Sequence, residues 1–341
     1  YYDVKTLSCL LCVLAVVGAL RRVGLFPLLA QRLVQVFRTT RGAVTALIGI
    51  TLVGSMLLTN DTALLTFLPL SWFVLERTGQ TKWTALTFIL QNCAANLGGM
   101  LMPFGNPQNL YLYSHFELSL DTFIRSIGPF SLLSLVLLLL VTMFTPRETI
   151  SLDTAGRDTT SDETFPKRCL FCCLGMFFLC LCTVAGLLPL PILFICILAI
   201  GCLADPKIFC QVDYSLILTF IGFFIFIGNL KHIPAVSSLL SSMITGHEVI
   251  VSVLASQVIS NVPTAILLSG FTEKGVSLLI GTNLGGLGTL IASMASLISY
   301  KYIVRSCPEK KGIYFRWFTI ANAGFLVILM ALYFLVFYSI R

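Results

Sequence analysis

The sequence has 341 residues, of which 57% are hydrophobic and only 11% are charged, with a formal net charge of +7. Its mean hydropathy is +0.94. Soluble domains carry about 25% charged residues, so this composition excludes a soluble globular protein and predicts an all-α, multi-pass integral membrane protein. The chain has no room for a separate catalytic domain, because each spanning helix uses about 20 residues. We therefore expect a protein that is not an enzyme.

Continuous apolar runs predict spanning helices at 7–26, 83–116, 128–144, 169–187, 190–204, 214–229, 276–300 and 317–340. Two other apolar stretches, 42–75 and 248–271, are each too short for two spans of about 20 residues. The first is interrupted at Asn60-Asp61-Thr62 and the second at Asn261-Val262-Pro263-Thr264. We expect each stretch to form a re-entrant hairpin.

The distribution of basic residues supports the hairpins. With the N-terminus outside, the predicted inside segments hold 17 of the 22 Lys and Arg residues; these segments are 21–41, 76–82, 146–168, 205–212 and 301–316. A single crossing at 248–271 would move five basic residues outside, against the positive-inside rule. Residues 27–41 fit an interfacial amphipathic helix, and 146–168 fit a solvated linker.

The two halves of the chain share an internal repeat. Asn96-Leu97-Gly98-Gly99 recurs letter for letter as Asn283-Leu284-Gly285-Gly286, and the two hairpin interruptions resemble each other. Asp3 lies fifteen residues before Gly18, as Asp213 does before Gly228. The offsets of these three blocks are 210, 201 and 187, in the same order along the chain. Three matches in order are strong evidence for a repeat.

The number of crossings predicts how the repeats are oriented. Five predicted spans separate their starts, so the repeats have inverted topology, which is typical of secondary transporters. We expect a first repeat at 1–145, with its hairpin at 42–75 and a broken helix at 83–116. A cytoplasmic linker and two connecting helices follow at 146–212. The second repeat is expected at 213–341, with its hairpin at 248–271 and a broken helix at 276–300.

Two glycine-rich segments carry the candidate site. Residues 96–109 and 283–296 interrupt apolar spans with glycine, and the first also with proline. Unwound carbonyl groups can coordinate Na⁺, and the free N–H groups of half-helix N-termini favour an anion. The alternative is structural: the glycines permit close helix packing and the amides bridge helices.

Asp61 is the acidic residue expected deep in the membrane. A carboxylate there is costly, so it is a candidate cation ligand or proton carrier. The alternative is that Asn60 or Asp61 caps the second arm of the hairpin. No Lys or Arg is expected at this depth, and this weakens the hypothesis that the substrate is a tricarboxylate.

The remaining reactive residues indicate no metal or catalytic site. Most of the 12 cysteines lie in apolar runs, and His115, His232 and His247 fall near predicted membrane edges, so packing is the preferred interpretation for both. The chain contains no HExxH, GxSxG or GxxxxGK[ST] motif. We expect no cofactor, no bound metal beyond Na⁺, and no nucleic-acid partner.

Together, Asn60-Asp61-Thr62, Ser260-Asn261 to Thr264 and the Gly-Gly to Gly-Asn-Pro-Gln-Asn interruption resemble the ion transporter superfamily. This superfamily includes citrate-transporter-like permeases, divalent anion/sodium symporters, the arsenite pump membrane subunit and sodium/proton antiporters. The resemblance implies a homodimer that works as an elevator. Thr59 stands where the symporters have Ser, and Pro263 interrupts the second tip; both departures put a dicarboxylate site in doubt.

The resulting hypothesis is a secondary transporter of small anions, either a carboxylate or an arsenite-type oxyanion, coupled to Na⁺ or H⁺ in the plasma (inner) membrane. The candidate substrate ligands are Asn60, Thr62, Asn106, Gln108, Asn109, Asn261, Thr264, Ser293 and Ser296. The candidate cation-coupling residues are Asn60, Asp61, Gly98, Gly105 and Gly285. The main alternative is a sodium/proton antiporter of the same fold, followed by a passive channel and an intramembrane hydrolase.

Overall fold

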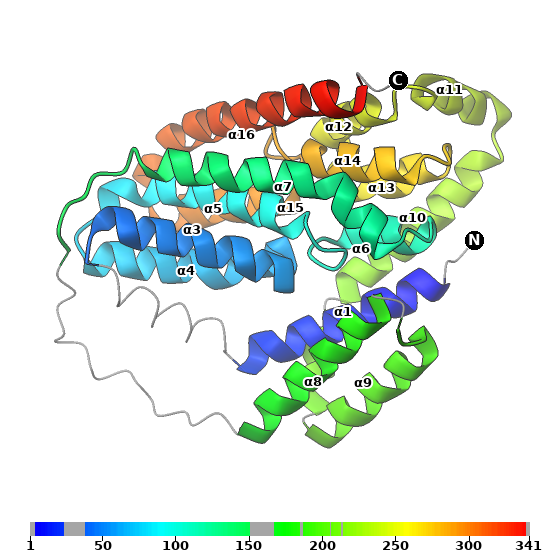
Figure 1. Ribbon diagram of the computed structural model, residues 1–341, viewed down its shortest axis with the longest axis horizontal. Helices are drawn as coiled ribbons and strands as arrows, with labels where there is room; N and C mark the ends of the chain where they lie inside the picture. The colour runs from blue at the N-terminus through cyan, green and yellow to red at the C-terminus, as the bar shows by residue number, and fades with distance from the viewer. Residues whose placement is uncertain are drawn as a thin grey trace.

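The computed structural model describes residues 4–23, 38–150, 167–184, 187–204, 206–212 and 214–338. These residues form helices joined by short turns, with one isolated bridge between Thr39 and Thr149 (Figure 1). The prediction of an all-α fold is therefore confirmed. The helices are α1 (Val4–Val23), α3 (Thr40–Leu57), α4 (Asn60–Arg77), α5 (Thr84–Gly99), α6 (Pro107–His115), α7 (Leu120–Thr142), α8 (Lys167–Val184), α9 (Leu190–Ala204), α10 (Tyr214–Lys231), α11 (Pro234–Ile244), α12 (Glu248–Ile259), α13 (Asn261–Ser269), α14 (Gly275–Gly285), α15 (Met294–Ser306) and α16 (Lys311–Tyr333).

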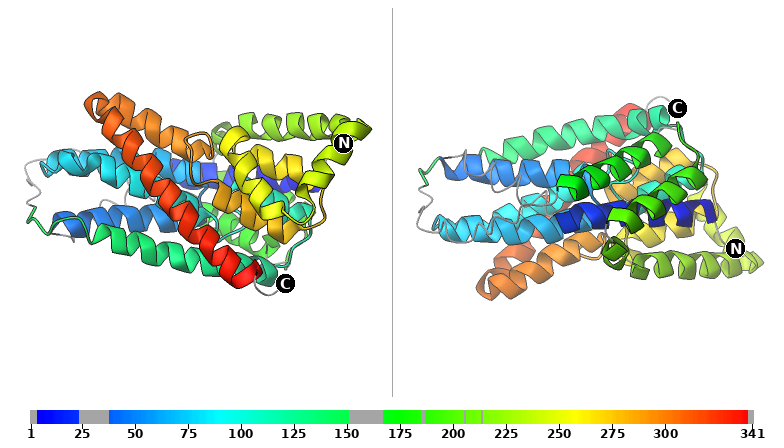
Figure 2. Two further views of the ribbon diagram at one scale, coloured as in Figure 1. Left: turned by 90° about the horizontal axis from the view of Figure 1, so that it is seen from above. Right: turned by 90° about the horizontal axis from the view of Figure 1, so that it is seen from below.

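The helices form two neighbouring bundles and a smaller group. Helices α3, α4, α5 and α7 run alongside one another, and α12, α13 and α14 form the second bundle (Figure 1). Helix α1 packs against α8 and α9 below them. The view from above shows α16 lying across the outside of the assembly (Figure 2). Helices α6 and α15 join the bundles, since α6 contacts both α13 and α14 while α15 contacts α4 and α5.

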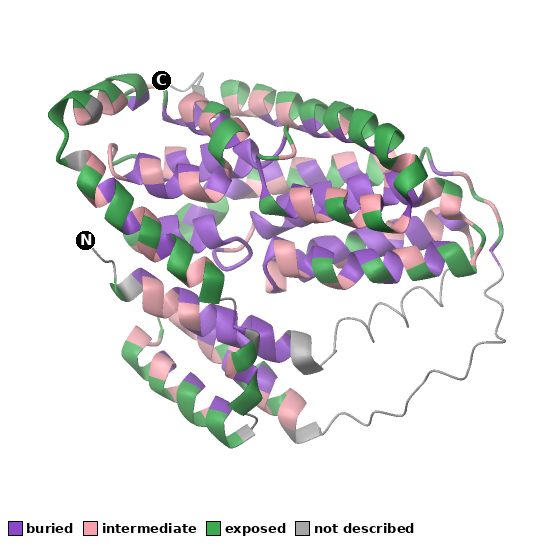
Figure 3. Cartoon of the chain, turned by 180° about the vertical axis from the view of Figure 1, so that it is seen from behind, coloured by how far each residue is buried: buried purple, intermediate pink, exposed green. Residues whose placement is uncertain are grey.

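The outer surface is apolar, as a lipid-facing surface must be. The outward side of α16 is largely exposed (Figure 3). In this helix Val327 and Ile328 are 68% and 43% exposed, whereas Phe318 and Leu329 are buried. Within the described residues, Thr40–Leu57, Leu120–Thr142 and Pro308–Val336 are long and apolar enough to span a membrane. Shorter apolar helices accompany them, including Leu190–Leu203 and Tyr214–Leu230. The chain is a multi-pass integral membrane protein.

Both glycine-rich segments break a helix, as the sequence predicts. The run 83–116 is divided into α5 and α6, with residues 100–106 unwound between them. The run 276–300 is likewise divided into α14 and α15, with 286–293 unwound. Proline and glycine explain the first break, because neither favours the interior of a helix.

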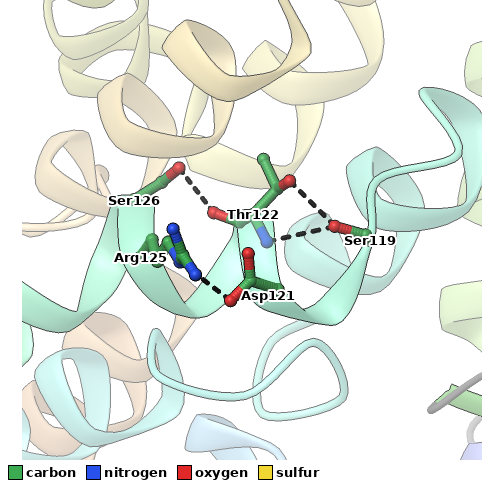
Figure 4. Close-up of polar contacts among 5 residues, drawn as sticks. All are labelled: Ser119, Asp121, Thr122, Arg125 and Ser126. Carbon is green, nitrogen blue, oxygen red and sulfur yellow. Dashed lines mark hydrogen bonds and ion pairs between the residues drawn. The ribbon is translucent and has the colours of Figure 1, made fainter.

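Two helices begin before the predicted spans. Helix α7 begins at Leu120, eight residues before the predicted span 128–144, where the Ser119 hydroxyl caps the Thr122 N–H group (Figure 4). Asp121 and Arg125 form an exposed i,i+4 ion pair of 2.8 Å on this turn. Helix α16 similarly begins at Lys311 instead of residue 317, directly after a 3₁₀ turn at Pro308–Lys310.

The hairpin interruptions lie slightly earlier in the chain than predicted. Helix α3 ends at Leu57 and α4 already begins at Asn60, so the polar residues form the first turn of the second arm. In the second hairpin the turn is Ser260, and Pro263 belongs to the first turn of α13. Proline is tolerated there because the first N–H groups of a helix have no partner within the helix.

Some expectations fall partly or wholly outside the described residues. The amphipathic helix proposed at 27–41 is described only from residue 38, and α3 already begins at Thr40. Most of the proposed linker, residues 151–166, and the repeat markers Asp3 and Asp213 are outside the description. Helix α11 was not predicted as a separate element. It is joined to α12 at an angle of 118°.

Several predicted inside segments meet at one end of the molecule. Arg41 Nε donates to the Thr145 carbonyl oxygen at 2.7 Å, and Lys82 pairs with Glu148 at 2.8 Å. Lys310 Nζ donates to the Thr81 carbonyl oxygen. These contacts place the first residues of α3 and α5, the end of α7 and the turn before α16 beside one another.

Candidate functional site

Each hairpin turn is fixed against the middle of a broken helix. The backbone N–H of Asn60 donates to the Gly105 carbonyl oxygen at 3.1 Å, and that of Asn261 donates to the Ala292 carbonyl oxygen at 3.0 Å. Gly105 directly precedes the N-cap of α6, and Ala292 directly precedes Ser293, the N-cap of α15. The two halves therefore use the same contact at matching positions.

The two broken helices also exchange reciprocal contacts. Ser293 Oγ donates to Asn96 Oδ1 at 2.8 Å, and Asn106 Nδ2 contacts Asn283 Oδ1 at 3.4 Å. Ser293 and Asn106 are the N-caps of the second half-helices, whereas Asn96 and Asn283 occupy matching places in the repeated Asn-Leu-Gly-Gly motif. Residues far apart in the sequence thus meet in one buried polar network.

The network continues on both sides of these contacts. Asn60 Nδ2 donates to Asn96 Oδ1 at 3.0 Å, which joins the first hairpin to the network. Asn283 Nδ2 donates to Asn109 Oδ1 at 2.6 Å, and Asn109 Nδ2 contacts the carbonyl oxygens of the unwound segment at Gly99, Met100 and Met102. The side chains of all five asparagines are at most 5% exposed. We call Asn60, Asn96, Asn106, Asn109 and Asn283 the asparagine network.

Backbone contacts determine which way these amides face. Asn60 Oδ1 accepts from the Asp61 N–H, so Asn60 must present its Nδ2 to Asn96, which then accepts through Oδ1. Asn283 Nδ2 donates to the Leu279 carbonyl oxygen, so Asn283 presents its Oδ1 to Asn106. Asn96 is therefore left with a free donor and Asn106 with a free acceptor.

Five buried polar atoms around the network have no hydrogen-bond partner in the described protein: Asn96 Nδ2, Asn106 Oδ1, Gln108 Oε1, Gln108 Nε2 and Ser296 Oγ. An unpaired buried polar group costs about 1–3 kcal/mol. Several unpaired buried polar groups close together are expected where a ligand supplies the missing hydrogen-bond partners. Both donors and acceptors are among these unpaired atoms.

Four helix N-termini converge on the network, those of α4, α6, α13 and α15. Helices α6, α13 and α15 begin without a side-chain hydrogen bond from the N-cap residue. Pro107 and Pro263 carry no N–H group, and the Asn261 N–H already donates to Ala292, so α15 keeps the most free N–H groups. The positive end of the helix dipole makes all such termini favourable for anions. The segments 58–62, 96–109, 260–264 and 283–296 contain no Lys, Arg or His. An anion bound here would be held by helix ends and amide groups.

The glycines of the repeated motif allow close approach between helices. A Cβ atom at Gly98 would clash with the Leu52 carbonyl oxygen of α3, and one at Gly285 would lie 2.6 Å from Ser256 Oγ of α12. At Gly105 it would meet the backbone of Gly99. The carbonyl oxygens of these three candidate cation ligands already accept hydrogen bonds: that of Gly98 from the N–H groups of Met100 and Leu101, that of Gly285 from Gln257, and that of Gly105 from Asn60. A carbonyl oxygen has two lone pairs, so Gly285 and Gly105 each keep one for an ion.

The predicted hydroxyl and acidic residues occupy different positions. Thr264 Oγ1 donates to the Ser260 carbonyl oxygen at 2.8 Å, and Thr62 Oγ1 accepts from Thr59 Oγ1 at 2.9 Å, so both contact their own turns. Thr59, and not Asn60 or Asp61, is the N-cap of α4, because its hydroxyl accepts from the Thr62 N–H. Asp61 is half-buried in the first turn of α4, next to the asparagine network.

The structure adds residues that the sequence did not assign to the site. Asn96 and Asn283 lie at its centre. Both belong to the identically repeated Asn-Leu-Gly-Gly motif, and this repetition was the sequence signal that could have assigned them to the site. Gln257 is also new: its Nε2 donates to the carbonyl oxygens of Gly285 and Leu287, and its Oε1 accepts from the Thr289 N–H. It stabilises the unwound end of α14. No repeat pointed to it, since the matching position in the first half is Met56.

Ser260 has an unusual backbone conformation, with φ of 73° and ψ of 156°. This region is strained for a residue with a Cβ atom and costs of the order of 1–3 kcal/mol. The Asn261 N–H bond to Ala292 holds the turn in place. Thr59, at the matching turn, has an ordinary extended conformation with φ of −78°. The two hairpin turns therefore differ both in strain and in charge.

Comparison with known proteins identifies the family of this chain. Residues 1–273 match the family described as citrate transporter, CitMHS. The chain is 31% identical to the uncharacterized transporter MJ0456 of Methanocaldococcus jannaschii, over 87% of this chain and 80% of the relative. It is 30% identical to the inner membrane protein YbiR of Escherichia coli, over 82% and 74% respectively. A shorter region, 37% of this chain and 26% of the relative, is 31% identical to the silicon efflux transporter LSI3 of rice. The chain belongs to the citrate transporter family.

Proposed function

We propose that this protein is a secondary active transporter of small anions, and that cation binding or protonation at Asp61 is coupled to anion movement. The observation that carries this proposal is the group of buried donors and acceptors left free around the asparagine network. The acceptors Asn106 Oδ1 and Gln108 Oε1 suit a cation, while Asn96 Nδ2, Gln108 Nε2 and the helix N-termini suit an anion.

The proposed transport mechanism uses two inverted repeats. The matched contacts Asn60 to Gly105 and Asn261 to Ala292 support this, as do the reciprocal contacts of Asn96 with Ser293 and of Asn106 with Asn283. A site built from both halves is the arrangement expected at the interface of inverted repeats. We further propose re-entrant hairpins, an elevator movement and a homodimer, in line with the superfamily resemblance. The name of the Escherichia coli relative supports a plasma (inner) membrane location.

The substrate we propose is a small carboxylate or an oxyanion of the arsenite type. The segments that form the site offer no Lys or Arg to neutralise a multivalent anion. Amides and helix N-termini supply hydrogen bonds and partial charges, which suit a substrate of low charge. The silicon efflux transporter among the relatives supports an oxyacid, although that similarity covers only part of either chain.

One observation favours a second candidate, a sodium/proton antiporter. Asp61 is the only charged residue in the segments 58–62, 96–109, 260–264 and 283–296. A lone carboxylate can alternate between Na⁺ and H⁺ without any anion being carried. The two candidates differ in whether Na⁺ alone moves protons.

The substitution Asp61→Asn tests the coupling role. We expect it to abolish cation-coupled uptake and its pH dependence, because the amide retains the size of the side chain but cannot take up a proton or balance a cation. Uptake by proteoliposomes should be measured across a range of pH values with and without a Na⁺ gradient.

Asp121→Asn provides a matched control. Asp121 also lies in the first turn of a helix, but it is exposed and paired with Arg125. This variant should transport as the unmodified protein does. Undiminished and equally pH-dependent uptake by Asp61→Asn, with the protein folded, would remove Asp61 from the mechanism.

A further inference from the structure

The outer face of the first bundle contains a groove between α5, α7 and α16. Its volume is about 310 Å³, and its walls are almost entirely apolar. Trp317, Ala321, Gly324 and Ile328 of α16 line one side, and Leu86 of α5 and Val141 of α7 lie on the others. Gly324 is exposed, and a Cβ atom built on it meets no other atom within 4 Å. The groove is thus open space on the lipid-facing surface.

The length of the groove matches one leaflet of a bilayer. Trp317 and Ile328 are eleven residues apart on α16, which corresponds to about 16 Å along a helix. The hydrocarbon core of a bilayer is about 30 Å thick, so this is close to half of it. One acyl chain that extends from the headgroup region would follow the groove from Trp317 to Ile328.

The end of the groove near Trp317 is basic. Helices α5 and α16 begin at this end of the groove, and α7 ends at it. The adjoining segments 76–83, 143–150 and 305–316 contain seven Lys or Arg residues and three Glu residues. Lys82 is paired with Glu148, whose pKa is lowered by that hydrogen bond. Lys311 and Arg316 are exposed in the first two turns of α16, on either side of the helix face that lines the groove.

We propose that this groove is a binding site for an anionic phospholipid, with one acyl chain along α16 and the phosphate at Lys311 and Arg316. Anionic headgroups are attracted to basic residues at the membrane surface. A second copy of this chain fits less well. Two copies inserted in the same orientation would bring their basic mouths together, and like charges oppose association.

Quenching of Trp317 fluorescence tests this proposal directly, because Trp317 lines the groove. The protein is reconstituted in two sets of vesicles. One set contains phosphatidylglycerol with brominated acyl chains, and the other contains phosphatidylcholine with brominated acyl chains at the same mole fraction. Trp72 and Trp83 are replaced by phenylalanine so that Trp317 alone reports. Should that variant fail to fold, the spectrum of Trp317→Phe is subtracted from that of the unmodified protein.

We expect stronger quenching by the brominated phosphatidylglycerol. Lys311→Gln and Arg316→Gln should each reduce the preference for this lipid about fivefold, the effect of one basic charge near the membrane surface. Gly324→Leu should remove the preference by filling the groove. Gly222→Leu is the matched control, because Gly222 of α10 is equally exposed and open, and it should leave the preference unchanged.

Two results would overturn the proposal. Equal quenching by both lipids would mean that Trp317 contacts bulk lipid only. Weak quenching by both lipids that changes with the protein-to-lipid ratio would mean that a second copy of the chain covers the groove.

Discussion

Replacing Gly98 by alanine is expected to destabilise the protein and to abolish transport. Alanine is favoured over glycine in a helix by about 1 kcal/mol, so helix propensity alone would predict a gain. The added Cβ atom, however, would clash with the Leu52 carbonyl oxygen and would come within 2.5 Å of Ser55 Oγ. Backbone atoms cannot rotate away as a flexible side chain does. Overpacking of this kind costs about 1–3 kcal/mol and would also separate α5 from the hairpin.

Gly49→Ala is the control for this prediction. Gly49 lies on α3, where a Cβ atom would meet nothing within 4 Å. This variant should keep full transport and should be as stable as the unmodified protein or slightly more stable. Thermal unfolding in detergent, followed by uptake in proteoliposomes, compares the two. Equal behaviour of Gly98→Ala and Gly49→Ala would show that close helix approach at the repeated motif is not required.

Replacing Asn283 by alanine is the second change with a large expected effect. Its side chain contacts Asn106, Asn109 and the Leu279 carbonyl oxygen. Without it, buried polar groups in both halves lose their partners, at about 1–3 kcal/mol for each group left unsatisfied. We expect a loss of about 2–5 kcal/mol in unfolding free energy on this basis, together with loss of uptake.

Asn229→Ala separates the effect of the network from the loss of a local hydrogen bond. Asn229 Nδ2 donates to the Ile225 carbonyl oxygen at 2.8 Å, as Asn283 Nδ2 does to that of Leu279, but Asn229 is exposed on α10. Its replacement should change stability by less than about 0.5 kcal/mol, as is usual for surface positions. A similarly small change for Asn283→Ala would contradict a shared network.

The sequence predicted the parts of the site that depend on repetition. The Asn-Leu-Gly-Gly motif and the two polar interruptions marked both broken helices and both hairpin turns, because backbone breaks in apolar segments require Gly, Pro or polar residues. It did not predict which amides face each other. Asn96 accepts from Ser293, 197 residues away, and Asn283 accepts from Asn106, 177 residues away; such long-range pairing depends on tertiary packing.

Local polar residues misled the prediction of helix starts. The predicted span 128–144 begins after Asp121 and Arg125, whereas α7 itself begins at Leu120 behind the Ser119 cap and includes both residues. Likewise, the N-cap of α4 proved to be Thr59, one residue before the predicted interruption. Polar residues in the first turn of a helix resemble a loop in the sequence, because the same side chains satisfy free N–H groups in both places.

The most direct test of the account uses proteoliposomes that contain a pH-sensitive dye and are connected to a current readout. A Na⁺ jump is applied first alone and then together with citrate, succinate or arsenite. The account predicts no proton or charge movement with Na⁺ alone, and a saturable signal, absent from Asp61→Asn, once a transported anion is added. Proton movement on Na⁺ alone that no anion changes would contradict it and would identify an antiporter.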